Sequence, residues 1–184
     1  MPAASLRLFC CAAAVALLAG CNLPQPQVDL TRHFTLSGPS GPVVADGVRV
    51  RPVQLAGHLR SRAMAVRVGP NEVIYLEDVR WAEPLDEAIT SALRARLGGV
   101  PGDYAVSVQV QRCEVDRSAG NAVVVSATYT LHPGAEGGVD RRGNFTASPR
   151  SWDGREPAAL VAALRAGIDE LADAIVAALP ASGK

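Results

Sequence analysis

Residues 72–110 read EVIYLEDVRWAEPLDEAITSALRARLGGVPGDYAVSVQV, and this stretch decides the fold class. Glu72–Glu77 is rich in apolar and β-branched residues, so it predicts a central strand. Pro84–Leu97 predicts a helix, and Tyr104–Val110 alternates apolar and polar residues as a half-buried strand does. The order strand, helix, strand predicts an α/β fold in which the two strands form a right-handed crossover.

The helix between these strands has clear ends. Pro84 stands at the expected first position, where its missing N–H group removes no helical hydrogen bond, and Gly98 follows the expected last residue. Acidic residues lie in the first turn and arginines in the last turn, which complements the helix dipole. An apolar stripe at helical spacing, formed by Leu85, Ile89, Leu93 and Leu97, predicts that one side packs on the sheet.

The same patterns continue on both sides of this stretch. Val123–Leu131 alternates with period two and predicts a hairpin partner for the strand at Tyr104, and the alternation slips near Arg112–Cys113, which predicts a β-bulge. Pro157–Leu179 has helical spacing and predicts a second helix. Further strands are expected at His33–Leu36, Val48–Val53, Met64–Val68 and Asp140–Ala147. Residues 33–180 therefore predict a single α/β domain, with a mixed sheet of about five to six strands and two main helices packed on it.

The first 21 residues, MPAASLRLFCCAAAVALLAGC, have the composition of a secretory signal. Arg7 supplies the positive charge, an apolar run follows, and the last four residues resemble a bacterial lipobox. We therefore expect residues 1–20 to be a signal peptide and Cys21 to be the lipid attachment site, which would anchor the chain to a membrane. The alternative is an ordinary signal peptide that is cut near Ala19.

Residues 21–32 form a polar segment with two prolines, and we expect this segment to be a flexible tether. Asn22 follows the lipobox cysteine. By the sorting rule for this class of lipoprotein, an aspartate at that position retains the protein in the inner membrane. Asn22 is not that residue, so the expected location is the outer membrane, facing the periplasm.

Charge and cysteine content exclude several function classes. Lys and Arg number 18, and Asp and Glu also number 18, so a basic face for nucleic acid is not expected. Cys113 is the cysteine that remains after removal of the signal and lipidation, and its strand pattern predicts a buried structural residue. His33, His58 and His132 stand in separate segments without metal-ligand spacing. No nucleophile–base pair can be named from the sequence, so we expect no catalytic site, no metal and no cofactor.

The segment Arg80-Trp81-Ala82-Glu83-Pro84-Leu85 is the candidate site that stands out. Trp81 can be a structural junction that packs on the helix, with Glu83 capping the free N–H groups. Trp81 and Arg80 side by side are also typical of a partner interface. Both interpretations stay open, and together they assign Arg80, Trp81, Glu83 and Pro84 to an interface or a structural junction.

The string RWAEPL after GPNEVIYLE, together with the closing helix AALVAALRAGIDELADAIVAAL, resembles the ABC-type transport auxiliary lipoproteins over residues 30–180. Tyr129 departs from the family pattern, in which a tryptophan is expected. The resemblance implies a non-enzymatic accessory lipoprotein that docks a periplasmic MCE (mammalian cell entry) protein at the outer membrane, with an inner-membrane ABC permease and ATPase. Such systems move lipids or other apolar compounds, and the lipoprotein could form a homo-oligomer.

Two other functions stay open at this stage. The first is a free-standing envelope lipoprotein that binds a lipid or a cell-wall ligand, which would need an apolar pocket between sheet and helices. The second is a hydrolase, which the sequence disfavours.

Overall fold

The computed structural model describes residues 28–36, 47–98, 104–135 and 138–180. The chain divides into two units, Met1–Leu30 and Thr31–Lys184, and the fold below is that of the second unit. The expected signal peptide over residues 1–20, the lipidation site Cys21 and the sorting residue Asn22 lie outside the described residues.

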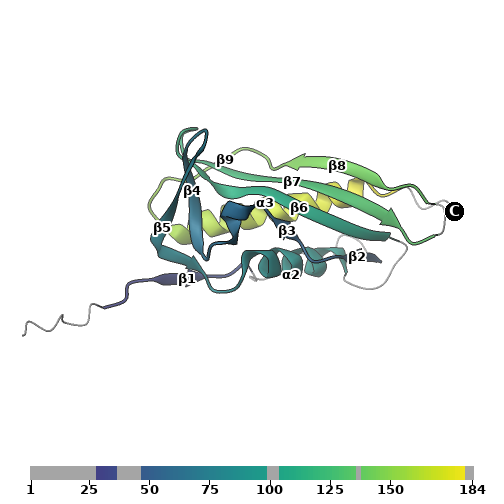
Figure 1. Cartoon of the computed structure of the whole chain (residues 1–184), viewed down its shortest axis with the longest axis horizontal. Coiled ribbons are helices and arrows are strands. Elements are labelled where there is room, and N and C mark those ends of the chain that lie inside the picture. Colours follow the sequence, from purple (N-terminus) through teal and green to yellow (C-terminus); the bar gives the residue numbers. More distant parts are fainter. Residues whose placement is uncertain (1–27, 37–46, 99–103, 136–137, 181–184) are drawn as a thin grey trace, which may run out of the picture. The chain divides into compact units, whose positions relative to one another are not determined.

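Two α-helices and a mixed sheet, found in the part of the chain that the structure describes, confirm the expected α/β class (Figure 1). Within the described residues the sheet follows the order β1-β5-β4-β6-β7-β8, and three short strands, β2, β3 and β9, pair beside this path. The six strands of the path match the expected number, and the three short strands are additional. In chain order the elements are β1 (Arg32–Phe34), β2 (Val48–Val50), β3 (Gln54–Leu55), the 3₁₀-helix η1 (Gly57–Arg60), β4 (Ala63–Gly69), β5 (Glu72–Trp81), α2 (Leu85–Leu97), β6 (Tyr104–Asp116), β7 (Ala122–Pro133), β8 (Arg141–Thr146), β9 (Arg150–Ser151) and α3 (Pro157–Ala177).

The long hairpin β6–β7 is the centre of the sheet. Its antiparallel register runs from the Tyr104–Pro133 pair to the Asp116–Ala122 pair and shifts at Gln111. This shift confirms the expected bulge. Because one extra residue is inserted, the core positions of β6 change from even numbers (Val106, Val108, Val110) to odd numbers (Cys113, Val115), so apolar side chains face the core on both sides of the bulge.

The α-helices α2 and α3 pack against each other. In addition, α3 packs on β7, and α2 packs on β2. The odd-numbered residues of β7 from Val123 to Leu131 belong to this core. A Cβ atom at Gly167 of α3 would lie 2.7 Å from Cγ2 of Val125, so the glycine permits a close approach of helix and sheet. The even-numbered residues of β7 lie on the opposite side, which we call the polar face because it carries Ser107, Gln109, Ser126, Thr128 and Thr130.

Strand β1 is tied to two other elements. It runs parallel to β5, with Arg32 beside Val79 and Phe34 beside Trp81. The guanidinium of Arg32 lies 2.8 Å from the carboxylate of Glu156, directly before α3. Residues 32–34 are therefore held by both the sheet and the helical layer.

Two expectations about β5 are wrong. β5 is antiparallel to β4, and β4 is parallel to β6, so β5 runs opposite to β6 and α2 does not join parallel strands. The physical reason is the tight turn after Gly69, which forces β4 and β5 into an antiparallel pair. Beyond its three pairs with β1, the outer edge of β5 has no strand partner among the described residues, and Ile74 and Tyr75 are 37% and 41% exposed. This end of β5 is therefore not central in the sheet.

Candidate functional site

The junction between β5 and α2 places Trp81 in the core. Its side chain is 2% exposed, and its backbone N–H donates to the carbonyl oxygen of Arg62 at 2.7 Å. Arg80 is exposed on the same strand. In this conformation the Trp81 indole acts as a structural anchor, and Arg80 is the side chain that the junction offers to solvent.

Glu83 and Pro84 complete the junction. Glu83 accepts a hydrogen bond from the hydroxyl of Thr35 at 2.6 Å, and the backbone N–H of Ala82 donates to the carbonyl oxygen of Phe34 at 2.8 Å. Helix α2 begins at Leu85, so Pro84 is its N-cap residue, and the proline ring makes no capping hydrogen bond. The carboxylate of Glu83 contacts the segment that follows β1, and its expected capping role stays a prediction.

A groove with a volume of about 660 Å³ opens directly beside this junction. Its walls come from β3, from the segment that joins η1 to β4, and from the start of α2. A second groove of about 470 Å³ shares Gln54 and Gln109 with the first and extends over the polar face. The second groove is lined by Arg51, Pro52, Gln54, Ser107, Val108, Gln109, Thr128 and Thr130. We call it the Ser107 groove.

Ser107 in this groove is hydrogen-bonded to a histidine. Its Oγ lies 3.0 Å from Nε2 of His132, and Nδ1 of the same imidazole lies 3.0 Å from Oδ2 of Asp140. β6 positions Ser107, β7 positions His132, and Asp140 directly precedes β8. The three side chains form a serine–histidine–aspartate relay, whose connectivity is that of a nucleophile, a base and an orienting carboxylate.

The carboxylate of Asp140 determines which atoms donate and which accept in the two hydrogen bonds of this relay. An ionised Asp140 only accepts hydrogen bonds, so Nδ1 of His132 must carry the proton that it shares with Asp140. In the neutral imidazole Nε2 is then an acceptor, and the hydroxyl of Ser107 donates to it. This is the proton arrangement that general-base activation of a serine requires.

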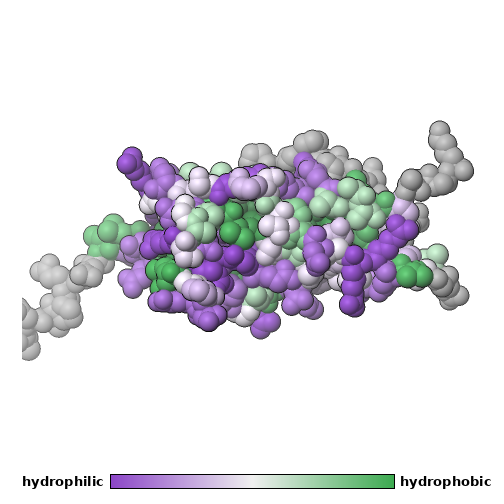
Figure 2. Space-filling model, turned by 90° about the horizontal axis from the view of Figure 1, so that it is seen from above, coloured by the Kyte–Doolittle hydropathy of each residue, from purple (hydrophilic) through white to green (hydrophobic). Residues whose placement is uncertain are grey.

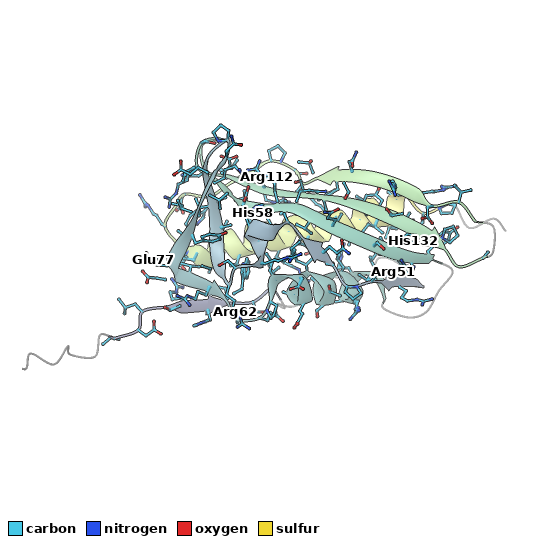
Figure 3. The ribbon with its side chains drawn as sticks, in the orientation of Figure 1. Arg51, His58, Arg62, Glu77, Arg112 and His132 are labelled. Carbon is cyan, nitrogen blue, oxygen red and sulfur yellow. The ribbon has the colours of Figure 1, made fainter. Side chains whose placement is uncertain are left out.

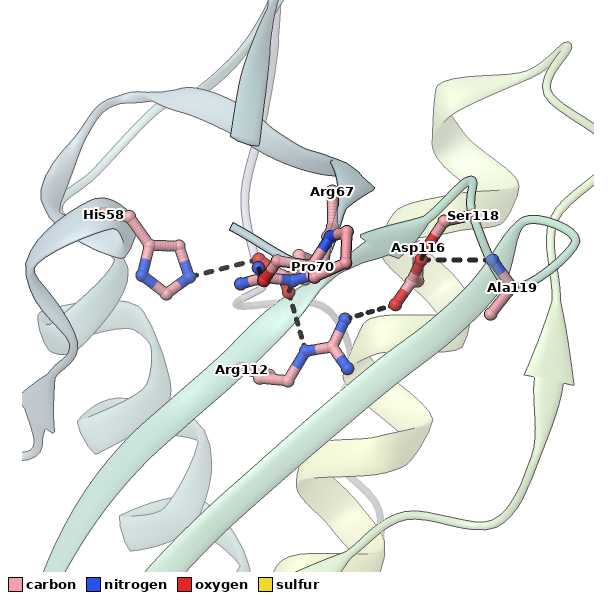
Figure 4. A network of polar contacts seen from close by, with 8 residues as sticks. His58, Arg67, Pro70, Arg112, Asp116, Ser118 and Ala119 are labelled. Carbon is pink, nitrogen blue, oxygen red and sulfur yellow. Dashed lines mark hydrogen bonds and ion pairs between the residues drawn. The ribbon is translucent and has the colours of Figure 1, made fainter. Parts of the chain in front are cut away.

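A second ionic cluster surrounds Glu114 at the other end of the hairpin (Figure 4). The Glu114 side chain has no solvent exposure; one carboxylate oxygen accepts from Nε of Arg67 and Nε of Arg112, both at 2.7 Å. Its other oxygen lies 3.1 Å from Nε2 of His58 in η1. Arg112 also pairs with Asp116 at 2.7 Å. We call these residues the Glu114 cluster; it fastens η1 and β4 onto β6.

Hydrogen bonds and burial shift the pKa values of residues in and beside this cluster. Burial alone would lower the pKa of Arg112, but its hydrogen bonds to Asp116 and Glu114 outweigh burial and raise it. Hydrogen bonds from the Ser118 hydroxyl and from Arg112 lower the pKa of Asp116. Burial, with a smaller contribution from the charge of Glu114, raises the pKa of Cys113 to about 12. Cys113 is buried, as expected, and its thiol is protonated at neutral pH.

Figure 3 shows the two polar sites at different places along the hairpin: Arg51 and His132 lie near one end of β6 and β7, and His58 and Arg112 lie near the other. In Figure 2, hydrophobic areas on the visible face are small and separated by hydrophilic side chains. Among the described residues, no group of three or more His, Cys, Asp or Glu side chains is arranged to hold a metal ion. None of the helices in these ranges combines the length and the apolar character needed to cross a membrane.

Sequence reasoning missed both polar sites. Ser107 and His132 are 25 residues apart, and His58 and Glu114 are 56 residues apart, so neither pair has a local motif. A partial sign was present in Arg112, Glu114 and Asp116, since alternate residues of a strand share one face. The expected site residue Cys21 lies outside the described residues.

A family model described as the ABC-type transport auxiliary lipoprotein component matches residues 34–176. The chain belongs to this family. The match begins at the last residue of β1 and ends one residue before the end of α3, so it covers strands β2 to β9 and nearly all of both helices. The family resemblance expected from the RWAEPL segment is therefore confirmed.

Two of the solved structures that match this chain share its fold, with TM-scores above 0.5. The alignment with the crystal structure of an uncharacterized protein covers 79% of this chain and 95% of the other chain, at 16% identity and a TM-score of 0.64. The alignment with the protein XCC0632 from Xanthomonas campestris, of the family DUF330, covers 79% of this chain and 89% of the XCC0632 chain, at 22% identity and a TM-score of 0.56. The alignment with PelC from Paraburkholderia phytofirmans, a dodecamer, covers 72% of this chain and 89% of the PelC chain, at 21% identity and a TM-score of 0.31. No curated protein sequence matches the chain.

Proposed function

We propose that this auxiliary lipoprotein is anchored by a lipid on Cys21 to the outer membrane, faces the periplasm, and docks an ABC transport system there. The periplasmic partner would be an MCE-domain protein, connected to an inner-membrane permease and ATPase, and the cargo would be lipids or other apolar compounds. The observation that carries this proposal is the family match over residues 34–176.

The β5–α2 junction supports a docking role. Trp81 is buried and its backbone is bonded to Arg62, so the junction is held in one conformation, while Arg80 is exposed beside it. Pro84 lines the groove of about 660 Å³ at the same place. A rigid segment that presents a charged side chain next to a groove is a suitable contact surface for a protein partner.

Recovery of the partners tests the proposal directly. The native lipoprotein, captured from envelope after mild crosslinking, should bring down MCE and ABC subunits. Recovery of neither would contradict the proposed partnership. The genes beside that of this protein should encode the same subunits.

Substitutions at the junction separate a structural role from a contact role. Trp81→Ala should lower the free energy of unfolding by about 3–5 kcal/mol, because it removes a buried aromatic side chain. Arg80→Ala should leave stability within about 0.5 kcal/mol and reduce recovery of the partner. Unchanged recovery with Arg80→Ala would place the contact surface elsewhere.

The anchor has its own test. Cys21→Ser should release the protein from membranes while thermal unfolding of the domain stays unchanged. Asn22→Asp should move the protein to the inner membrane fraction. A Cys21→Ser variant that stays in the membrane fraction would refute the lipid anchor.

A free-standing ligand-binding module is the second candidate. The two grooves described above contain arginine, glutamine, serine and threonine side chains in their walls, which suits a polar ligand such as a cell-wall fragment better than an acyl chain. Copurification of a cell-wall fragment with the isolated protein, detected by mass spectrometry, would favour this candidate. Self-association belongs to the proposal as well, and light scattering of the solubilised protein measures it.

A further inference from the structure

We propose that Ser107, His132 and Asp140 form a hydrolytic site that cleaves small, polar carboxylic esters. This activity goes beyond the proposed docking function and does not depend on it. The motivating geometry is the pair of 3.0 Å contacts, from Ser107 Oγ to His132 Nε2 and from His132 Nδ1 to Asp140 Oδ2. Both distances lie in the range for a nucleophile, its general base and the carboxylate that orients the base.

The nucleophile is accessible to a substrate. Ser107 lines the groove of about 470 Å³ on the polar face, and the His132 side chain is 23% exposed. The groove walls include Arg51, Gln54 and Thr128, so the groove favours a compact polar ester over a long acyl chain. In the part of the chain that the structure describes, the guanidinium of Arg51 has no ion pair, so it can meet an anionic group on the substrate.

Two further side chains can stabilise the oxygen that becomes negative during the reaction. Thr130 lies directly opposite Ser107 in the β6–β7 register, and Gln109 lies two residues along the same strand on the same face. Both residues line the Ser107 groove, and neither side chain is engaged in a hydrogen bond within the described ranges. Hydroxyl and amide groups placed beside a nucleophile can donate hydrogen bonds to an oxyanion.

The reaction is an acyl transfer to serine followed by hydrolysis. Ser107 Oγ attacks the ester carbonyl carbon, and its proton passes to Nε2 of His132. The carbon–oxygen bond to the leaving group breaks, and the proton passes from Nε2 to that oxygen, which departs as an alcohol. Water then attacks the acyl-serine, with His132 accepting its proton, and the carboxylic acid leaves while the Ser107 hydroxyl is restored.

The competing explanation is a purely structural link. The same contacts join β6, β7 and the residue before β8, so they could hold the strand ends together without chemistry. The two explanations differ in reactivity, because a structural serine is a poor nucleophile whereas a serine activated by a base reacts with electrophilic phosphorus.

Covalent labelling decides between them. The full chain in detergent micelles is incubated with a fluorophosphonate probe, and the modified residue is identified by mass spectrometry. We expect modification of Ser107, no modification in Ser107→Ala, and labelling reduced by roughly a hundredfold in His132→Gln, because general-base assistance is lost. Ser126→Ala is the matched control, since Ser126 lies on the same face of β7 and has no histidine partner in the described structure.

Turnover of 4-nitrophenyl acetate tests the same residues in hydrolysis. Ser107→Ala and His132→Gln should lose the release of 4-nitrophenol, while Ser126→Ala keeps it. Asp140 is a positioning residue, so Asp140→Asn should lower kcat more than it raises KM, and Asp140→Glu should restore part of kcat. Thermal unfolding of every variant confirms that it is folded.

Three results would overturn the proposal. They are absence of label on Ser107, equal labelling of Ser107 in wild type and His132→Gln, and turnover that survives Ser107→Ala. Each of these results leaves the docking function untouched, because that function is judged by partner recovery alone.

Discussion

The two ends of the β6–β7 hairpin carry ionic side chains in opposite environments. At one end the Glu114 cluster is sealed: the carboxylate is fully buried, and two arginines and a histidine surround it. At the other end the serine–histidine–aspartate relay is open: Ser107 lines a groove, and Asp140 is 55% exposed. The same polar face therefore holds one carboxylate that is closed to solvent, Glu114, and one that is open to it, Asp140.

This difference teaches where stability and reactivity reside. A buried charge must be paired, because an unpaired charge in the interior costs several kcal/mol. An exposed pair is screened by solvent and adds little to stability. The Glu114 cluster should therefore determine how tightly η1 and β4 are held, and the relay should matter little for folding.

The largest expected effect follows from removal of Glu114. Glu114→Ala removes the counter-charge of Arg67 and leaves Arg112 with Asp116 alone, so it should lower the free energy of unfolding by about 3 kcal/mol. Urea denaturation measures this change. The matched control is Glu72→Ala at an exposed position of β5, with an expected change within about 0.5 kcal/mol. A loss below about 1 kcal/mol for Glu114→Ala would show that the cluster is not a structural fastening.

A smaller effect is expected at Arg112. Arg112→Gln removes the side chain that bridges Glu114 and Asp116, but Arg67 still pairs with Glu114, so the loss should be about 1–2 kcal/mol. Arg117→Gln, in the exposed turn that follows, is the control. An equal loss for both variants would mean that net charge, and not the bridge, causes the effect.

Acid titration tests Asp116. Its pKa is lowered by the Ser118 hydroxyl and by Arg112, so its ionised form stabilises the folded state above the ordinary value of 3.8. This contribution is lost as the pH falls through the lower folded pKa. The free energy of unfolding of Asp116→Asn should therefore fall less steeply than that of wild type between about pH 5 and pH 2. Identical slopes of the free energy of unfolding against pH would contradict the stabilising role of ionised Asp116. Some acid sensitivity remains in both proteins, because the pKa of Glu170 is also lowered.

The smallest expected effect lies in the relay. His132→Gln should change the free energy of unfolding by no more than about 0.5 kcal/mol, because the imidazole is partly exposed and Asp140 is hydrated. Urea denaturation of His132→Gln and of Glu114→Ala under the same conditions compares the two changes in the free energy of unfolding. A loss as large as that of Glu114→Ala would remove the distinction between the two ends of the hairpin.

The local elements of the fold could be predicted from the sequence because their signals are periodic. The alternation in β6 and β7, the slip expected near Arg112–Cys113 and the helical spacing before Ala177 depend on neighbouring residues. Each has its counterpart in the structure, where the register shifts between Val110 and Arg112. The direction of β5 relative to β6 could not be predicted. The turn after Gly69 makes β5 antiparallel to β4, but the parallel pairing of β4 with β6 joins residues that are far apart in the sequence.

The candidate site was predictable only in part. RWAEPL indicated a distinctive junction, and the structure shows that Trp81 belongs to the core while Arg80 is exposed. The relay and the Glu114 cluster were not predictable, because pairing of β6 with β7 and the packing of η1 bring their members together. Contacts of this kind are a property of the register and not of any short segment.

The position of β1 has a mechanical consequence. If Cys21 carries the proposed anchor, any force between the membrane and the domain enters through residue 31 and reaches β1 first. A pull along the axis of β1 loads its three register pairs with β5 together, and the Arg32–Glu156 ion pair passes part of that load to the segment before α3. Resistance to such a pull depends on the rate of unfolding more than on equilibrium stability. Strand β1 would thus connect the membrane anchor mechanically to the sheet and to α3, so that the tethered domain could bear tension while its partner moves.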